Sequence, residues 1–175
     1  MKRIITALVF IVLLAPNANA QKEDAVLKQN LQALIGNFKG DAGVYVRHLK
    51  TGQMAAINAD TIFPTASMVK VPITIGMFNK IEKGEIAYDT VLTYKDSLLY
   101  AGEDILGSFK HGENIALGKV MMLMITTSDN TASLWCQSLA GGGAEINAWL
   151  DANGFKVTRV NSRTPGREGN RSRYG

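Results

Sequence analysis

The chain has 175 residues, of which 46% are hydrophobic and 19% are charged. This length corresponds to one domain or part of one, and the composition favours a globular fold with a sizeable core over a disordered chain. The formal net charge of +4 is low and scattered along the chain, so it does not indicate a nucleic-acid partner.

Residues 1–20 have the pattern of a secretory signal peptide: two basic residues, an apolar run from Ile4 to Leu14, and an A-x-A cleavage motif that ends at Ala20. Removal of this peptide lowers the net charge to about +2. The apolar run is too short to span a bilayer, and no other stretch approaches spanning length. We therefore expect a mature domain of residues 21–175 that is periplasmic or secreted and not embedded in a membrane.

The spacing of apolar residues predicts the first elements of the mature chain. Residues 22–36 place apolar side chains at helical intervals and are expected to form an amphipathic helix. Residues 43–49 and 53–57 alternate apolar with polar side chains on either side of a turn sequence, which predicts a β-hairpin. His48 lies in the first of these strands without acidic or histidine neighbours, so it is assigned no functional role.

The stretch from Thr65 to Lys83 is predicted to be a buried helix, because it is apolar on most of its faces. Ser67 and Lys70 lie three residues apart near its start and so share one face. A serine hydroxyl needs a neighbouring base to become a nucleophile, which makes Ser67 the candidate nucleophile and Lys70 its partner. The first turn of a helix also favours the negative charge of an oxyanion. Pro72 is expected to bend the helix just after this turn.

The polar residues 86–112 are predicted to form loops with short elements. Tyr100 in this stretch either forms one wall of a pocket or is an exposed loop residue. Residues 117–125 and 131–139 are predicted to be two further helices. A glycine triplet at 141–143 is interpreted as a flexible linker before a short helix at 144–151.

The break between the predicted helices at 117–125 and 131–139 contains Ser128-Asp129-Asn130. Ser, Asp and Asn are the preferred residues at helix N-termini, so these three have a structural explanation as a cap. They also allow a functional one, in which the Ser128 hydroxyl and the Asn130 carboxamide face a pocket while Asp129 holds the turn. Both interpretations can hold together.

Cysteine and histidine content gives no support for a metal or another cofactor. Cys136 is the only cysteine and lies in an apolar helical run, which predicts a buried and unreactive thiol. His48 and His111 are far apart in the sequence and lack the spacing of metal ligands. We expect the protein to act without a cofactor.

Together, Ser67-x-x-Lys70 and Ser128-Asp129-Asn130, about sixty residues later, resemble the motifs of the class A serine β-lactamases and penicillin-binding proteins. The resemblance implies an α+β fold with a helical domain packed on an antiparallel sheet. It also implies that Ser67 is acylated and that Lys70 accepts its proton. Ser128 would relay a proton to the departing nitrogen, and Asn130 would bind the substrate's side-chain amide.

The sequence departs from this family in two respects, of which the first is the absence of the third motif, K-T-G or K-S-G. In the family that motif lies on a strand that contributes a pocket wall and one of two oxyanion-hole N–H groups. We therefore expect an N-terminal fragment whose later sheet strands are missing.

The second departure concerns the loop that positions the hydrolytic water. The family's lactamases carry a glutamate four residues before an asparagine, whereas here Gly166 stands four before Asn170 and Glu168 only two before it. Glu168 is therefore either the base for deacylation, reaching the water by a different loop path, or a solvated surface charge. Asn170 is the expected partner for that water.

The function expected from these motifs is that of an exported, monomeric serine hydrolase that opens β-lactam rings. One alternative is a D-Ala-D-Ala peptidase that acts on peptidoglycan stem peptides. The other is a sensor that binds β-lactams or peptidoglycan without turnover, or an inactive fragment.

Overall fold

A computed structural model describes residues 22–100, 102 and 104–169 of the chain. The chain divides into two compact units that meet between Thr61 and Ile62, and each is described here by itself. The predicted signal peptide and Asn170 lie outside the described residues.

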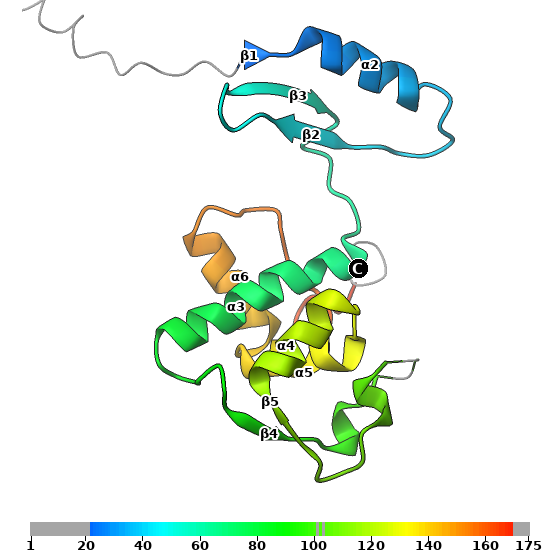
Figure 1. Cartoon of the computed structure of the whole chain (residues 1–175). Helices are drawn as coiled ribbons and strands as arrows, with labels where there is room; N and C mark the ends of the chain where they lie inside the picture. The colour runs from blue at the N-terminus through cyan, green and yellow to red at the C-terminus, as the bar shows by residue number, and fades with distance from the viewer. Residues whose placement is uncertain (1–21, 101, 103, 170–175) are drawn as a thin grey trace, which may run out of the picture. The chain divides into compact units, whose positions relative to one another are not determined.

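The first unit consists of one helix and a small sheet (Figure 1). Its described elements are β1 (Lys22–Glu23), α2 (Ala25–Ile35), β2 (Val44–Arg47) and β3 (Gln53–Ile57). The Asp24 side chain accepts a hydrogen bond from the Leu27 N–H and so caps α2, which explains why the helix begins where it does. The predicted helix is confirmed with slightly shorter bounds.

The predicted hairpin is also confirmed. Strands β2 and β3 pair antiparallel, and β1 pairs parallel with the other edge of β3, which gives the sheet order β1-β3-β2. Gly52 occupies the left-handed region with φ 74° in the connecting turn. His48 Nδ1 accepts a hydrogen bond from the Thr51 N–H at 3.1 Å, so this histidine holds the turn.

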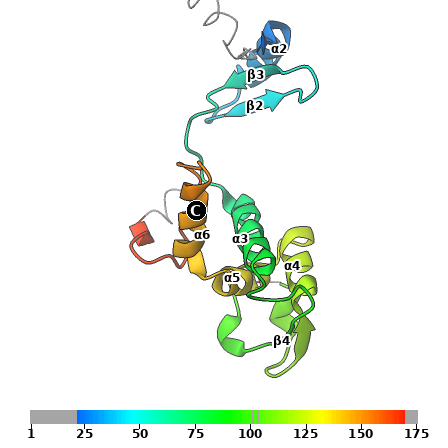
Figure 2. The same ribbon diagram turned by 90° about the vertical axis from the view of Figure 1, so that its left-hand side faces the viewer.

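The second unit contains the remaining helices, which surround a common core, and a two-stranded antiparallel sheet (Figures 1 and 2). Its described elements are the 3₁₀ turns η1 (Ala66–Val69), η2 (Asp96–Leu98) and η3 (Leu106–Ser108), the strands β4 (Val91–Thr93) and β5 (Asn114–Ala116), and the helices α3 (Lys70–Glu82), α4 (Leu117–Thr126), α5 (Asn130–Leu139) and α6 (Gly142–Ala152). The fold class is therefore α+β, as predicted. None of the helices in the described residues is long and apolar enough to cross a membrane.

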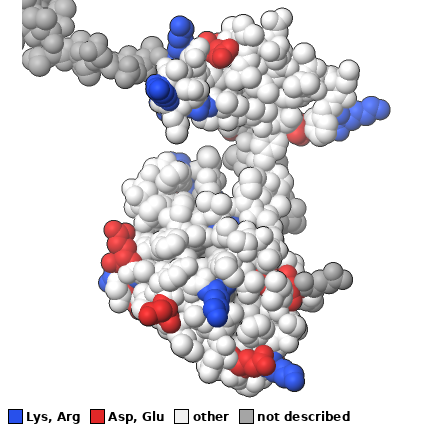
Figure 3. Space-filling view, viewed as in Figure 1, with Lys and Arg blue, Asp and Glu red and all other residues white. Residues whose placement is uncertain are grey.

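The core of the second unit lies between α3, α4, α5 and α6. Tyr94 is buried there and meets Trp135 edge to face, with ring centroids 6.1 Å apart. Met77, Met121 and Met124 are buried and fill this core, whereas Met122 is half exposed. On the face shown in Figure 3, acidic and basic side chains are interspersed over largely uncharged surface.

The start of the central helix differs from the prediction. The chain first makes the 3₁₀ turn η1 and becomes α-helical only at Lys70. Pro72 consequently lies in the first turn of α3, where an α-helix leaves its N–H groups without intrahelical partners. The ring therefore costs no helical hydrogen bond there, so the reason given for a bend at Pro72 does not apply.

The glycine triplet also differs from the prediction, because two of its members begin a helix. Gly141 has φ 90° and precedes α6, while Gly142 and Gly143 form its first turn. Gly143 is buried, and a β-carbon at this position would overlap Thr164 Oγ1. Here glycine permits the close approach of a later loop to the helix, so the triplet is not a flexible linker.

Candidate active site

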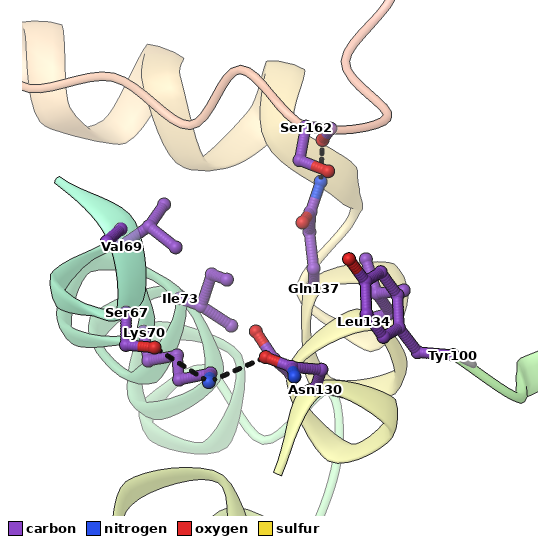
Figure 4. A pocket seen from close by; sticks show the side chains of 11 residues that line it. Ser67, Val69, Lys70, Ile73, Tyr100, Asn130, Leu134, Gln137 and Ser162 are labelled. Carbon is purple, nitrogen blue, oxygen red and sulfur yellow. Dashed lines mark hydrogen bonds between the residues drawn. The ribbon is translucent and has the colours of Figure 1, made fainter. Parts of the chain in front are cut away.

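Ser67 lies in the 3₁₀ turn at the head of α3, with Lys70 at the first position of the α-helix. Ala66, which precedes the serine, has φ 43°, a rare conformation for a residue other than glycine. Such strain is often found at functional sites. The turn places Lys70 Nζ 3.3 Å from Ser67 Oγ, so the predicted contact between the two side chains is present (Figure 4).

The Lys70 ammonium is the centre of the site. Besides Ser67 it contacts the Ser128 carbonyl oxygen at 2.6 Å, Ser128 Oγ at 2.7 Å and Asn130 Oδ1 at 2.9 Å. Only 4% of the residue is exposed. Burial lowers the pKa of Lys70, and the negative charges of Asp104 and Asp129 act against this lowering. A lowered pKa favours the neutral amine that a base requires.

Ser128 brings a second hydroxyl to the same point. Its Oγ donates a hydrogen bond to Ser67 Oγ at 2.9 Å while it contacts Lys70 Nζ. Ser128 has φ 59°, which places its backbone in the left-handed region, a conformation that is unfavourable for residues with a β-carbon. The three groups form a closed hydrogen-bonded triangle, in which a proton can pass between any two of them.

The two interpretations of Ser128-Asp129-Asn130 therefore describe the same structure. Asp129 is the N-cap of α5, and its Oδ1 accepts a hydrogen bond from the Ala132 N–H at 2.7 Å. Its Oδ2 accepts another from the Leu106 N–H at 2.9 Å. Asp129 is 1% exposed, so it holds the turn from within, while the residues on either side of it contact Lys70.

A pocket of about 330 Å³ opens beside this cluster. Figure 4 shows Ser67, Lys70 and Ile73 on one helix, and Asn130, Leu134 and Gln137 on the helix that faces it. Its lining residues are Ala66, Ser67, Val69, Lys70, Ile73, Tyr100, Asn130, Ser133, Leu134, Gln137 and Ser162. Tyr100 is thus in the pocket wall, which is one of the two positions expected for it.

The segment after α6 closes one end of the pocket through Ser162. Gln137 Nε2 donates to the Ser162 carbonyl oxygen at 2.6 Å, which ties this segment to α5. Asn147 on α6 forms two hydrogen bonds with the backbone of Val160, at 2.9 and 2.8 Å. The loop is therefore attached to two helices by buried side-chain amides.

Glu168 does not lie at this pocket. Its side chain is exposed, and Oε1 accepts a hydrogen bond from the Gly166 N–H at 3.0 Å. The structure thus brings together Ser67, Lys70, Ser128, Asn130 and Tyr100, but it does not bring Glu168 to them. A role for Glu168 in deacylation stays a prediction, as does the role of Asn170.

Three further residues of the site were missed by sequence reasoning. Gln137 and Ser162 line the pocket, and Asp104 accepts hydrogen bonds at the start of α5. Asp104 stands in a polar stretch where a carboxylate is usually solvated. Gln137 does lie seven residues after Asn130, two helical turns along the same face, and this spacing was a usable signal.

Comparison with known proteins agrees with this fold. A sequence model described as the beta-lactamase enzyme family matches residues 25–174. The chain belongs to this family. The predicted resemblance to class A β-lactamases and penicillin-binding proteins is thereby confirmed.

Among curated relatives, the β-lactamase VEB-1 of Pseudomonas aeruginosa is 25% identical over 156 residues, which cover 88% of this chain and 52% of that protein. The β-lactamase regulatory protein BlaB of Streptomyces cacaoi is 33% identical over 89 residues, which cover 50% of this chain and 28% of that protein. The chain thus spans about half the length of VEB-1 and less of BlaB.

Solved structures give the same result. The structure of PBP-A matches with a TM-score of 0.77 and 30% identity, covering 85% of this chain and 57% of that one. An ancestral class A β-lactamase matches with a TM-score of 0.71 and 27% identity, covering 80% of this chain and 56% of that one. A mutant of PBP-A has been solved as an acyl-enzyme complex with penicillin G.

Proposed function

We propose that the protein is an exported serine hydrolase that opens β-lactam rings through an acyl-enzyme on Ser67. The observation that carries this proposal is the triangle of Ser67 Oγ, Lys70 Nζ and Ser128 Oγ, with distances of 3.3, 2.7 and 2.9 Å. It provides a nucleophile, a base with a lowered pKa and a proton relay at one end of a pocket.

Acylation follows from this geometry. Ser67 Oγ attacks the β-lactam carbonyl carbon, and its proton passes to the neutral Lys70 amine, directly or through Ser128. When the C–N bond breaks, Ser128 Oγ gives its proton to the ring nitrogen and regains one from Lys70. The products of this step are an ester on Ser67 and a ring-opened amine.

The pocket provides groups to orient such a substrate. Asn130 Oδ1 is directed to Lys70, which leaves its Nδ2 to donate to the side-chain amide carbonyl of the substrate. Tyr100 provides an aromatic wall. The Ser67 N–H, in the first turn of η1, is suited to one half of the oxyanion hole.

A penicillin-binding peptidase is the second candidate function, and the position of Glu168 favours it. Hydrolysis of the ester needs a base within hydrogen-bond reach of a water molecule, and the carboxylate of Glu168 instead binds its own loop at Gly166. Such an enzyme would form a peptidyl ester on Ser67 from a D-Ala-D-Ala stem peptide, with release of the terminal D-Ala, and would hydrolyse its penicilloyl ester slowly. The sensor alternative would acylate and remain acylated.

Mass spectrometry of the complete protein with penicillin G tests the proposal. We expect one covalent adduct on the unmodified protein and none on Ser67→Ala. Ser138→Ala, an exposed serine on α5, is the matched control and should acylate normally. An undiminished adduct on Ser67→Ala would refute the assignment.

Nitrocefin turnover separates the three candidate functions. Fast turnover identifies a lactamase, and a slow return of free enzyme with cleavage of D-Ala-D-Ala peptides identifies a peptidase. Permanent acylation without peptide cleavage identifies a sensor.

A further inference from the structure

The start of α5, which presents Asn130 to Lys70, is capped by two carboxylates. Asp129 accepts from the Ala132 N–H at 2.7 Å. The second carboxylate is Asp104, in the loop between η2 and η3. Its Oδ2 accepts from the Asn130 N–H and from the Thr131 N–H, both at 2.9 Å.

These bonds complete the hydrogen bonding of the helix start. An α-helix leaves its first four N–H groups without intrahelical partners. Here the N-cap N–H of Asp129 donates to the Leu123 carbonyl oxygen at 3.3 Å, and the other three donate to the two carboxylates. Half of this set therefore depends on one oxygen atom of Asp104.

We propose that Asp104 is a positioning residue of the active site, whose carboxylate fixes the first turn of α5 so that Asn130 and Ser128 meet the Lys70 ammonium. This inference rests on the proposed function and adds a residue to it. It requires no contact between Asp104 and the substrate.

The geometry supports the assignment because Asn130 is joined to both groups. Its N–H donates to Asp104 while its Oδ1 accepts from Lys70 at 2.9 Å. A rotation of the first turn would therefore displace the carboxamide and, two residues earlier, Ser128. Displacements of about 1 Å in an active site can lower a rate by roughly 100-fold.

Asp104 is also linked to the pocket wall. The Thr131 hydroxyl donates to Asp104 Oδ2 at 3.3 Å and accepts from the Tyr100 N–H at 3.1 Å. The same carboxylate thus connects the start of α5 to the loop that carries the aromatic wall of the pocket. Tyr100 and Asp104 lie in the same loop, so the Tyr100 N–H and the Asp104 carboxylate both attach this loop to Thr131 of α5.

Charge gives Asp104 a second effect, which a neutral cap would lack. The start of a helix carries partial positive charge and so disfavours a neighbouring ammonium. The charged groups that act on Lys70 are Asp104 from the loop and Asp129 from α5, and both raise its pKa against the effect of burial. The carboxylate therefore raises the pH at which the amine becomes a base, in addition to holding the turn.

Two substitutions in the complete protein separate these effects. Asp104→Asn keeps an oxygen for the Asn130 and Thr131 N–H groups but removes the charge. Asp104→Ala removes both. Asp96→Asn, an exposed acid of the same loop region with 75% of its side chain accessible, is the matched control.

The first measurement is the titration of Lys70 by NMR with labelled lysine, assigned with Lys70→Arg. We expect Asp104→Asn to lower the pKa of Lys70 and Asp96→Asn to leave it unchanged. This readout needs no substrate. It therefore tests Asp104 even if the unmodified protein fails to acylate, an outcome that would refute the proposed function alone.

The second measurement is the rate of acylation by penicillin G across pH. We expect the acid limb to move to lower pH in both Asp104→Asn and Asp104→Ala, and the rate on the pH plateau to fall by roughly 10- to 100-fold in Asp104→Ala. Circular dichroism shows whether each variant is folded. If Asp104→Ala does not fold, the titration of Lys70 in Asp104→Asn tests the proposal on its own. An unchanged Lys70 pKa in Asp104→Asn, or a lower melting temperature in Asp104→Ala with an unchanged acylation rate, would overturn the proposal.

Discussion

Ser128 Oγ donates a hydrogen bond to Ser67 Oγ at 2.9 Å, although 61 positions separate the two residues in the sequence. Ser67 is on the turn before α3, and Ser128 is on the loop before α5. Because Lys70 Nζ contacts both hydroxyl groups, the removal of Ser128 leaves Ser67 and Lys70 in contact but breaks the relay to the leaving group in the proposed mechanism.

Ser128→Ala should therefore slow acylation by about 10²- to 10⁴-fold, the usual contribution of a positioned proton-transfer group. The measurement is the rate of adduct formation with penicillin G in the complete protein. Ser138→Ala on the exposed side of the same helix should keep the unmodified rate. Acylation at full rate in Ser128→Ala would show that Lys70 protonates the nitrogen without a relay.

The lowered pKa of Lys70 predicts the pH dependence of acylation. Only the neutral amine can accept the Ser67 proton, so the rate should rise with pH and level off below the ordinary lysine pKa of 10.5. Lys70→Arg, which stays protonated, should lose acylation across this range. Lys80→Arg on the same helix should retain the unmodified profile, since Lys80 pairs with Glu85 and Glu145.

The same shift has a consequence for stability. Between the lowered pKa of Lys70 in the folded protein and 10.5 in the unfolded chain, the unfolded chain binds more protons. The contribution of Lys70 to the free energy of unfolding should therefore increase as pH rises through this window. Comparison of urea unfolding of the unmodified protein and Lys70→Met at several pH values would measure this contribution, and an opposite slope would contradict it.

Local relationships in the site could be predicted from the sequence. The reach from Ser67 to Lys70 follows from three-residue spacing on a helical turn, and Asp129 as a cap follows from its residue type. The contact between Lys70 and Ser128 spans 58 positions and was expected only through the family resemblance. No local sequence pattern predicts this contact, because it depends on how α3 packs against α5.

Other features depended on tertiary contacts that the sequence does not display. Asp104 is 26 positions from Asn130, and an acid in a polar loop usually indicates a solvated charge. The sequence predicts a linker at Gly143, because Thr164, the neighbour that requires a glycine there, comes 21 positions later. The change from 3₁₀ to α geometry at Lys70 also escaped prediction, since both helix types fit the same residues.

Cys136 should be inert in the folded protein. It is completely buried, and burial raises the pKa of its thiol to about 12, so almost no reactive thiolate exists at pH 8. Thiol reagents such as iodoacetamide should label the protein only after denaturation, when the pKa returns to about 8.5. The measurement is the mass of the protein after labelling with and without guanidinium. Rapid labelling under native conditions would show that α5 opens locally.

Gly143→Ala should destabilise the protein. Alanine gains about 1 kcal/mol over glycine inside a helix, but here its β-carbon would overlap Thr164 Oγ1. Overpacking typically costs about 1 to 3 kcal/mol, so the net effect should be a loss of stability with displacement of the loop that carries Ser162. Gly36→Ala, where a β-carbon meets the Gln32 carbonyl oxygen at an ordinary 3.4 Å, is the control for thermal unfolding. Equal melting temperatures would show that the loop moves aside freely.

The loop expected to supply the base for deacylation departs from the lactamase pattern, with Gly166 four residues before Asn170 and Glu168 two before it. Among the described residues that line the pocket there is no carboxylate, and the exposed Glu168 binds the Gly166 N–H. If Glu168 keeps this position in the acyl-enzyme, release of the penicilloyl group should be slow, and Glu168→Gln should change its rate by no more than about twofold. Accumulation of the acyl-enzyme in Glu168→Gln alone would instead identify Glu168 as the base, reached through a rearrangement of its loop.

If the lack of a carboxylate in the pocket makes deacylation slow, the introduction of one should accelerate it. Ser162 lines the pocket from the segment after α6, and its backbone is held by Gln137, so a carboxylate at this position would enter the pocket. Ser162→Asp should therefore accelerate hydrolysis of the ester by about 10²-fold or more, as a positioned general base does. Ser162→Asn, of the same size but without a basic oxygen, should not. Equal deacylation by the two variants would show that the absence of a carboxylate is not what limits turnover.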